Sequence, residues 1–154
     1  MGDSKRKKVV QKKISYKETV TQINTPESIY KMYPTWRFCT CDTEYWSFTE
    51  NHIGKRFWTE ILPFFKSLET QTWNEILVKA RDNNHPIQAD ELSHKAQKRL
   101  SQLHIEAESI VSLRVSGTHR VYGYFSEFSF CILWYDDDHG DNNECVCRSR
   151  LKHT

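Results

Sequence analysis

Three segments near the C-terminal end of the chain have the residue alternation of β-strands and follow one another with very short breaks. They cover residues 109–116, 119–125 and 128–135 and are rich in Val, Ile, Tyr and Phe. The breaks, Ser116-Gly117-Thr118 and Ser126-Glu127, suit tight turns. Strands joined by such short turns pair with their direct neighbours, so the sequence predicts an antiparallel meander.

Segments before the meander have the apolar spacing of amphipathic helices. Apolar residues recur every three or four positions over about 53–69, which predicts a helix that Pro63 bends. The pattern Thr72-Trp73-Asn74-Glu75 is a capping box and predicts a second helix through Ile76, Leu77 and Ala80. Asp90 is expected to cap a third helix. The apolar face of this third helix would contain Leu92, Ala96, Leu100 and Leu103.

The order of these elements predicts the fold class. Residues 36–41 alternate as a strand before the helices, and residues 144–151 are expected to return as a last strand. A strand, then helices, then strands indicates an α+β domain, with the helices packed on one face of a mostly antiparallel sheet. A chain of 154 residues with only 5 Gly and 4 Pro shows no linker, so residues 18–154 are expected to form a single domain.

Residues 1–17 form a basic segment with seven Lys or Arg and one Asp, a formal charge of +6. Because the whole chain carries +2, residues 18–154 carry −4. A basic arm on a mildly acidic body fits salt-sensitive contact with phosphates, and a solvated flexible tail is the alternative. No apolar run reaches the ~18 residues of a membrane span and no apolar signal segment follows the N-terminus, so we expect a cytoplasmic protein without a membrane partner.

Two residue clusters raise the question of a metal. Four cysteines form two Cys-x-Cys pairs, and strands that placed the pairs side by side could enclose a zinc ion. Packed, reduced cysteines are the default expectation, so no cofactor is assigned. Clustered carboxylates beside His139 suit Mg²⁺ or Mn²⁺, with a solvated acidic turn as the favoured alternative. The residues concerned are Cys39, Cys41, Cys145 and Cys147 for zinc, and Asp136, Asp137, Asp138, Asp141 and Glu144 for the acidic cluster.

The strand that begins near His119 carries residues suited to nucleic-acid chemistry. Alternation places Arg120, Tyr122 and Tyr124 on one face and His119 on the other. A guanidinium pairs with phosphates and aromatic rings stack on bases, so we expect this face to be an RNA-binding surface rather than a core face. Further candidate RNA contacts lie on the basic face of the third helix: Lys95, Lys98 and Arg99.

The Gly-x-His-Arg segment at 117–120, the helices before it and the late His139 together resemble the RelE/ParE superfamily of small toxins. The similarity is strongest to RelE- and YoeB-like ribosome-dependent messenger-RNA endonucleases and spans roughly residues 90–139. It implies a RelE/ParE-like fold, ribosome-bound messenger RNA as substrate and a protein antitoxin or other regulatory partner. By position it implies that Arg120 contacts phosphate and that His139 transfers protons. Residues 73–153 also resemble a group of small bacterial proteins of unknown activity.

Cleavage of RNA by its own 2′-hydroxyl requires a base, a cation for the phosphorane charge and an acid for the leaving oxygen, and needs no metal. The candidates are His139 or Glu108 for the base, Arg120 and Arg114 for the charge, and His119 or Tyr122 for the acid or an orienting group. The leading hypothesis is therefore a metal-independent endoribonuclease similar to messenger-RNA interferases. The alternative is a non-catalytic RNA- or protein-binding regulatory or defence module on the same fold.

Overall fold

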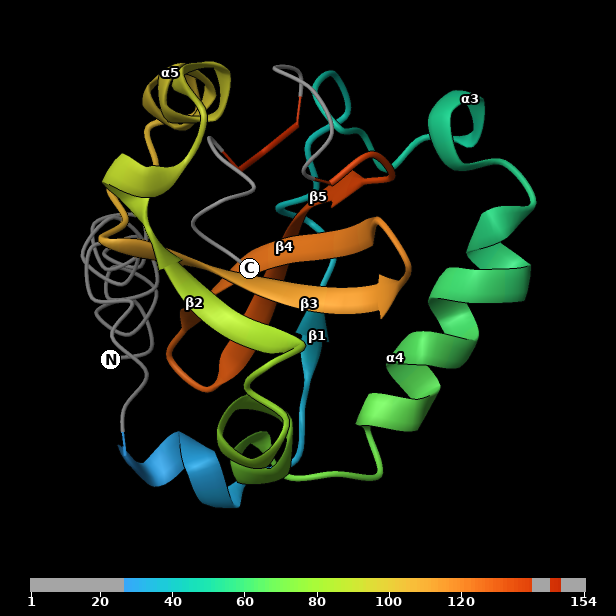
Figure 1. The fold of residues 1–154 in the computed structure, drawn as a ribbon, viewed down its shortest axis with the longest axis vertical. Coiled ribbons are helices and arrows are strands. Elements are labelled where there is room, and N and C mark those ends of the chain that lie inside the picture. The colour runs from blue at the N-terminus through green and yellow to red at the C-terminus, as the bar shows by residue number, and fades with distance from the viewer. Residues whose placement is uncertain (1–26, 140–144, 148–154) are drawn as a thin grey trace, which may run out of the picture.

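The computed structural model describes residues 27–139 and 145–147 and is built around a five-stranded sheet (Figure 1). The strand order is β1 (Trp36–Arg37), β5 (Ser129–Asp136), β4 (His119–Ser126), β3 (Ser109–Ser116) and β2 (Asn84–Gln88). Only β1 pairs in parallel, with β5, and the other three pairings are antiparallel. A mostly antiparallel sheet with separate helical segments confirms the α+β class.

The predicted meander is present, and its strand ends lie within one residue of the predicted ones. Gly117 occupies the β3–β4 turn with φ 42°, a backbone conformation that glycine adopts without steric cost. A bulge falls between Arg114 and Ser116 on β3. Between Tyr122 and Gly123 the pairing with β5 also shifts, and Leu133 is the extra residue. Both irregularities change which side chains share a face near the turn.

One face of the sheet is covered by the helices within residues 27–79. These are η1 (Glu27–Lys31), α3 (Glu50–Ile53), the π-helical turn η2 (Phe57–Ile61), α4 (Leu62–Leu68) and the π-helical turn η3 (Glu75–Lys79). The capping box before η3 is confirmed, because the Thr72 amide donates to Glu75 Oε1 at 2.9 Å and the Glu75 amide donates to Thr72 Oγ1 at 3.3 Å. Trp73 is fully buried beside it and packs its ring on Phe125 at 4.8 Å.

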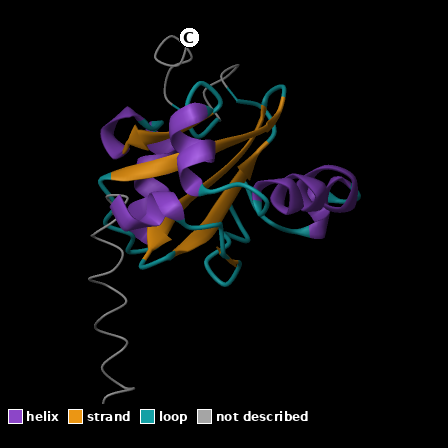
Figure 2. Ribbon diagram, turned by 90° about the horizontal axis from the view of Figure 1, so that it is seen from below, coloured by secondary structure: helices purple, strands orange, loops and turns teal. Residues whose placement is uncertain are grey.

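The opposite face is covered by α5 (His94–Gln102), with η4 (Ala89–Glu91) before it, so helices lie on both sides of the sheet (Figure 2). On β4, Val121 belongs to the core on the α4 side, whereas Tyr122 belongs to the core on the α5 side. The expectation that all helices pack on one face is therefore wrong. Its physical reason is that consecutive residues of β4 and β5 are buried, which requires cover on both faces of the sheet.

Several local expectations also differ from the structure. Ser93 caps α5 in place of Asp90, because Ser93 Oγ accepts the Ala96 amide at 3.1 Å. β2 was not predicted, and its Pro86 is tolerated because β2 is an edge strand. The strand expected at 36–41 has only two residues.

Other expectations fall partly or wholly outside the described residues. Of the strand expected at 144–151, Cys145–Cys147 are described, and Cys147 forms an isolated bridge with Leu92. The basic segment 1–17 lies outside the described residues. None of the described helices has both the length and the apolar character needed to cross a bilayer.

Candidate functional site

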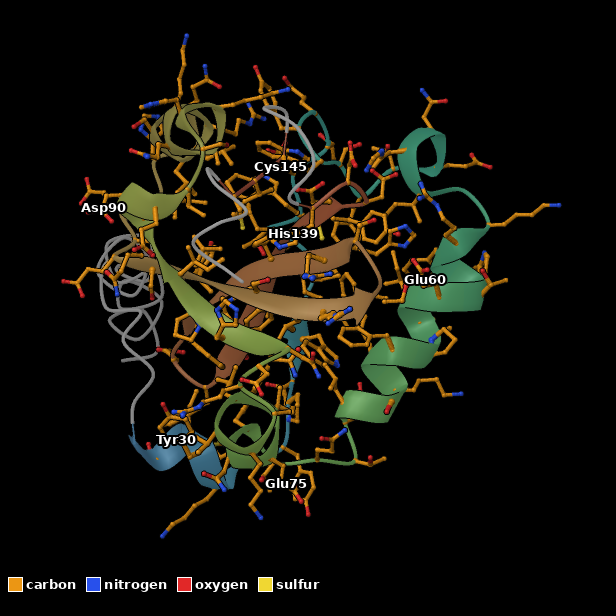
Figure 3. The ribbon with its side chains drawn as sticks, viewed as in Figure 1. Tyr30, Glu60, Glu75, Asp90, His139 and Cys145 are labelled. Atoms are coloured by element: carbon orange, nitrogen blue, oxygen red, sulfur yellow. The ribbon has the colours of Figure 1, made fainter. Side chains whose placement is uncertain are left out.

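Polar side chains gather at the end of the sheet where β3 turns into β4 and where β5 ends. Across the strands, Arg114 lies opposite Arg120, and Arg120 lies opposite Asp136. The chain after β5 continues along the same edge, where the His139 amide donates to the Thr118 carbonyl at 3.0 Å. Figure 3 labels His139 over the sheet and Glu60 on the helix beside it. This end of the sheet is the candidate site.

The two arginines form a pair of like charges on neighbouring strands. Arg114 Nη1 donates to Asn83 Oδ1 at 3.3 Å, and Arg120 Nη1 donates to the carbonyls of Gly117 at 2.6 Å and His119 at 3.2 Å. Within the described part of the chain, neither guanidinium forms an ion pair with a carboxylate. Burial and the charge of Arg114 lower the pKa of Arg120. An anion bound between the two side chains would relieve this repulsion.

The imidazole of His139 contacts the hydroxyl of Tyr122, a buried residue of β4. The Tyr122 hydroxyl lies 3.1 Å from His139 Nδ1 and 3.2 Å from Cys147 Sγ. Burial raises the pKa of Tyr122 well above its ordinary value, so the hydroxyl stays protonated. A tyrosine hydroxyl donates to a neutral imidazole and accepts from an imidazolium, so Tyr122 holds His139 in both protonation states. Arg114 therefore lies beside Arg120, and His139 beside Tyr122, at the same end of the sheet.

The expectation that Tyr122 and Tyr124 form an open stacking surface is wrong. Both side chains have 0% exposure and pack in the core with α5. The sequence pattern Arg-x-Tyr-x-Tyr places them correctly on one face, but α5 covers that face beyond Arg120. Tyr124 therefore contributes to packing, and Tyr122 acts on the site only through its hydroxyl.

Glu108 is not part of the site. It precedes β3, whereas Arg114 lies near the other end of that strand, and six residues of strand span roughly 20 Å. Glu108 instead lines a separate groove with Asp90 and Glu106. Its predicted role as the base is therefore not supported by its position.

The basic residues of α5 have different surroundings from one another. Arg99 donates to Asp42 Oδ2 at 2.8 Å and to Asp42 Oδ1 at 2.9 Å, and its guanidinium lies 4.5 Å from the Tyr45 ring centroid. The Lys95 ammonium lies 5.5 Å from the ring centroids of Tyr45 and Trp46. Lys98 is exposed. The open basic face expected on this helix is wrong for Arg99, because its charge is neutralised by a buried aspartate.

A second polar cluster on the α4 side was missed in part by the sequence analysis. Glu60 of η2 accepts from His119 Nδ1 at 2.8 Å, from the Tyr135 hydroxyl at 2.6 Å and from Ser116 Oγ at 3.1 Å. His119 was a candidate, whereas Glu60 was not. Its position between Phe57 and Ile61, inside an apolar stripe, is the sequence feature that could have identified it.

The metal hypotheses find no support in the arrangement of these groups. Asp136 accepts the amides of Asp138 at 2.9 Å and Val146 at 2.8 Å, and Asp137 pairs with Arg56 at 2.9 Å. Asp141 and Glu144 lie outside the described residues. Among the described residues, no group of three or more His, Cys, Asp or Glu is arranged to hold a metal ion.

The zinc arrangement of four thiolates is also wrong. Cys41 packs against the core on the α4 side, whereas Cys145 and Cys147 are buried in the core on the α5 side. Cys39 is exposed. All five cysteines are described and all are free thiols. The four thiols therefore do not meet, because Cys39 is exposed and the other three belong to cores on opposite faces of the sheet.

An apolar groove lies away from the polar cluster, between the chain after β1 and the α3–η2 segment. Its volume is about 750 Å³, and its aromatic lining includes Phe38, Phe48, Phe57 and Trp58. Trp58 is 68% exposed. The groove contains none of the residues assigned above to proton transfer or phosphate binding, so it is not part of the candidate site.

Comparison with known proteins does not identify a family or a function for this chain. No family model, curated protein or solved structure matches this chain. The class that the fold defines is an α+β protein with a mixed five-stranded sheet.

Proposed function

We propose that this protein cleaves RNA through side-chain acid–base chemistry at the end of the sheet that carries Arg114, Arg120 and His139. The observation that carries the proposal is the cross-strand pair Arg114–Arg120, which no described carboxylate neutralises. Two guanidiniums on one face suit the charge of a phosphodiester and the larger charge of its phosphorane.

His139 supplies proton transfer in this proposal. Its ring is tied to Tyr122 at 3.1 Å and its backbone to Thr118 at 3.0 Å, so the imidazole is positioned by both side chain and backbone. Arg120 reaches the same turn through its contacts with Gly117 and His119. A positioned imidazole and a cation supply two of the three groups that transesterification of RNA uses: one proton-transfer group and the charge for the phosphorane.

We also propose the fold likeness, the substrate, the partner and the location that the sequence resemblance implies. The fold is RelE/ParE-like, the substrate is messenger RNA with or without the ribosome, and a separate protein partner controls the activity in the cytoplasm. The shared order of helices followed by an antiparallel meander supports this likeness. The parallel strand β1 and the edge strand β2 are additional features of this chain.

The test is cleavage of messenger RNA, with ribosomes present and absent. Arg120→Ala and His139→Gln should each lower the cleavage rate by about 100-fold or more and lower RNA affinity much less, because both groups act on the transition state. Arg81→Ala and His94→Gln are matched controls on exposed residues and should retain the wild-type rate. Addition of EDTA should not change the rate.

The alternative is a non-catalytic RNA-binding module that uses the same arginine pair. Binding of phosphates needs only Arg114 and Arg120, whereas cleavage also needs His139. RNA binding that depends on both arginines, without any cleavage by the folded wild type, would establish the alternative and refute the enzyme.

A further inference from the structure

The cluster of Glu60, His119 and Tyr135 has the geometry of an oriented acid–base group. His119 Nδ1 lies 2.8 Å and 2.9 Å from the two oxygens of Glu60. Tyr135 donates to Glu60 Oε1 at 2.6 Å. The three residues come from η2, β4 and β5, so the tertiary structure holds all of them.

Glu60 decides which nitrogen of His119 carries the proton. Burial tends to raise the pKa of Glu60, but hydrogen bonds from Tyr135, His119 and Ser116 outweigh it and lower the pKa. An ionised carboxylate only accepts hydrogen bonds, so His119 carries its proton on Nδ1. The lone pair of the neutral ring is then on Nε2.

The free nitrogen of His119 is accessible. Nε2 has no hydrogen-bond partner among residues 27–139 and 145–147. The side chain of His119 is 26% exposed, and that of Glu60 is 23% exposed. An imidazole fixed by a carboxylate on one nitrogen, with its other nitrogen open to solvent, is the arrangement of a general base.

His119 shares its turn with the residues of the proposed site. The guanidinium of Arg120 donates to the carbonyl of His119 at 3.2 Å, and the His139 amide donates to the adjacent Thr118 carbonyl at 3.0 Å. His119 therefore begins β4 at this turn, His139 contacts the turn from the chain after β5, and the Arg120 guanidinium is bound to the same turn. Cleavage of RNA needs two proton-transfer groups, and His139 alone supplies one.

We propose that His119 is the general base of the reaction and that Glu60 is its positioning residue, an inference that rests on the proposed function. His119 Nε2 takes the proton of the 2′-hydroxyl while the 2′-oxygen forms a bond to phosphorus. The bond from phosphorus to the 5′-oxygen breaks, and the imidazolium of His139 gives its proton to that oxygen. The products are a 2′,3′-cyclic phosphate and a 5′-hydroxyl, and the two histidines have exchanged protonation states.

The first test compares normal RNA with RNA in which sulfur replaces the 5′-bridging oxygen at one position. A sulfur leaving group needs no protonation, so a defect in the general acid disappears on this substrate and a defect in the general base persists. His119→Gln should lower cleavage of both substrates by about 100-fold or more. His139→Gln should be impaired only on the oxygen substrate. His94→Gln should cleave both at the wild-type rate.

The second test follows the tautomer of His119 by ¹⁵N NMR and does not depend on activity. The wild type should carry the proton of the neutral ring on Nδ1, and Glu60→Gln should shift the population toward Nε2. His119→Ala provides a check on folding, because added imidazole should restore part of its cleavage rate.

The outcomes separate the two proposals. Wild-type cleavage with an unimpaired His119→Gln variant overturns the role of His119 and leaves the proposed function in place. Recovery of His119→Gln on the sulfur substrate shows that His119 is the acid and also overturns it. A folded wild type that cleaves neither substrate overturns the proposed function and, with it, this inference.

Discussion

Asp42 and Arg99 form a two-point ion pair between the chain after β1 and α5, with Arg99 Nε 2.8 Å from Oδ2 and Arg99 Nη2 2.9 Å from Oδ1 of Asp42. Asp42 is 3% exposed and also accepts from Trp134 Nε1 at 3.0 Å. The pair therefore connects α5, β5 and the segment that follows β1, on the same side of the sheet as the arginine pair.

Removal of Asp42 should destabilise the fold strongly. In Asp42→Ala the guanidinium of Arg99 and the indole of Trp134 lose their acceptor, so we expect a loss of about 3 kcal/mol in the free energy of unfolding. Urea denaturation of the two proteins measures it. Glu44→Ala is the control, because Glu44 is exposed and lies 3.9 Å from Arg99. An equal loss in both variants would contradict the central role of Asp42.

The same carboxylate should make stability depend on pH. Burial tends to raise the pKa of Asp42, but hydrogen bonds from Arg99, from two backbone amides and from Trp134 outweigh it, so the pKa lies below its ordinary value of 3.8. A lowered folded-state pKa contributes stability above the unfolded value, which is lost as the pH falls through the folded value. The difference in Tm between wild type and Asp42→Ala should be constant above about pH 5 and narrow below about pH 4. A Tm difference between the two proteins that stays constant down to pH 2 would show that ionisation of Asp42 does not stabilise the fold.

Gly123 should not tolerate a side chain. A Cβ atom there would collide with the Cys131 carbonyl oxygen and lie 2.7 Å from Cζ of Phe130. Both neighbours are buried, so Gly123→Ala should cost about 3 kcal/mol in unfolding free energy. Gly117→Ala is the matched control: nothing lies within 4 Å of its Cβ, and the positive φ alone should cost about 1 kcal/mol. Thermal unfolding of both variants tests the order of the two costs.

The capping box at Thr72 and Glu75 should stabilise the turn that carries Trp73. Thr72→Ala removes the acceptor of the Glu75 amide and should lower the free energy of unfolding by about 1 kcal/mol. Thr43→Ala, at an exposed threonine, should change it by less than about 0.5 kcal/mol. If the two variants unfold at the same denaturant concentration, the cap contributes nothing.

Substitutions of Arg114 and Tyr124 should distinguish a residue that binds RNA from a residue that only packs in the core. Arg114→Ala should weaken RNA binding for all sequences and reduce the slope of log affinity against log salt by about one, because one phosphate contact is lost. Tyr124→Leu should lower stability by about 1–3 kcal/mol and leave RNA affinity unchanged, because its ring is buried. Binding titrations at several salt concentrations measure both effects. A tyrosine variant that folds normally and loses affinity would restore Tyr124 as a stacking residue.

Local patterns predicted the elements that depend on near neighbours in the chain. The meander follows from alternation and short turns, and the capping box follows from two residues three positions apart. The pairing of Arg114 with Arg120 does not follow from the turn alone. Ser116 pairs with His119, so a regular register would place Val115 opposite Arg120, and the bulge in β3 places Arg114 there instead. The sequence did not predict β2, because its His-Pro segment lacks apolar alternation. This strand forms through its antiparallel pairing with β3.

The site was predictable only where its residues come from the meander. Alternation places Arg120 and Tyr122 on one face of β4, whereas the position of Arg114 opposite Arg120 depends on the bulge in β3. Glu60 lies 59 residues before His119, and their contact depends on where η2 packs against the sheet. No local pattern encodes that distance.

The sequence by itself determined the order of the elements, the position of the β3–β4 turn and the alternation of side chains along the regular parts of the strands, because these depend on turn length and on a repeat of two residues. Only the tertiary structure decided which face of each strand is covered. The same alternation that grouped Arg120, Tyr122 and Tyr124 left open whether solvent or a helix meets them. Packing of α5 buried the two tyrosines and ended short of Arg120, and packing of η2 placed a carboxylate on His119.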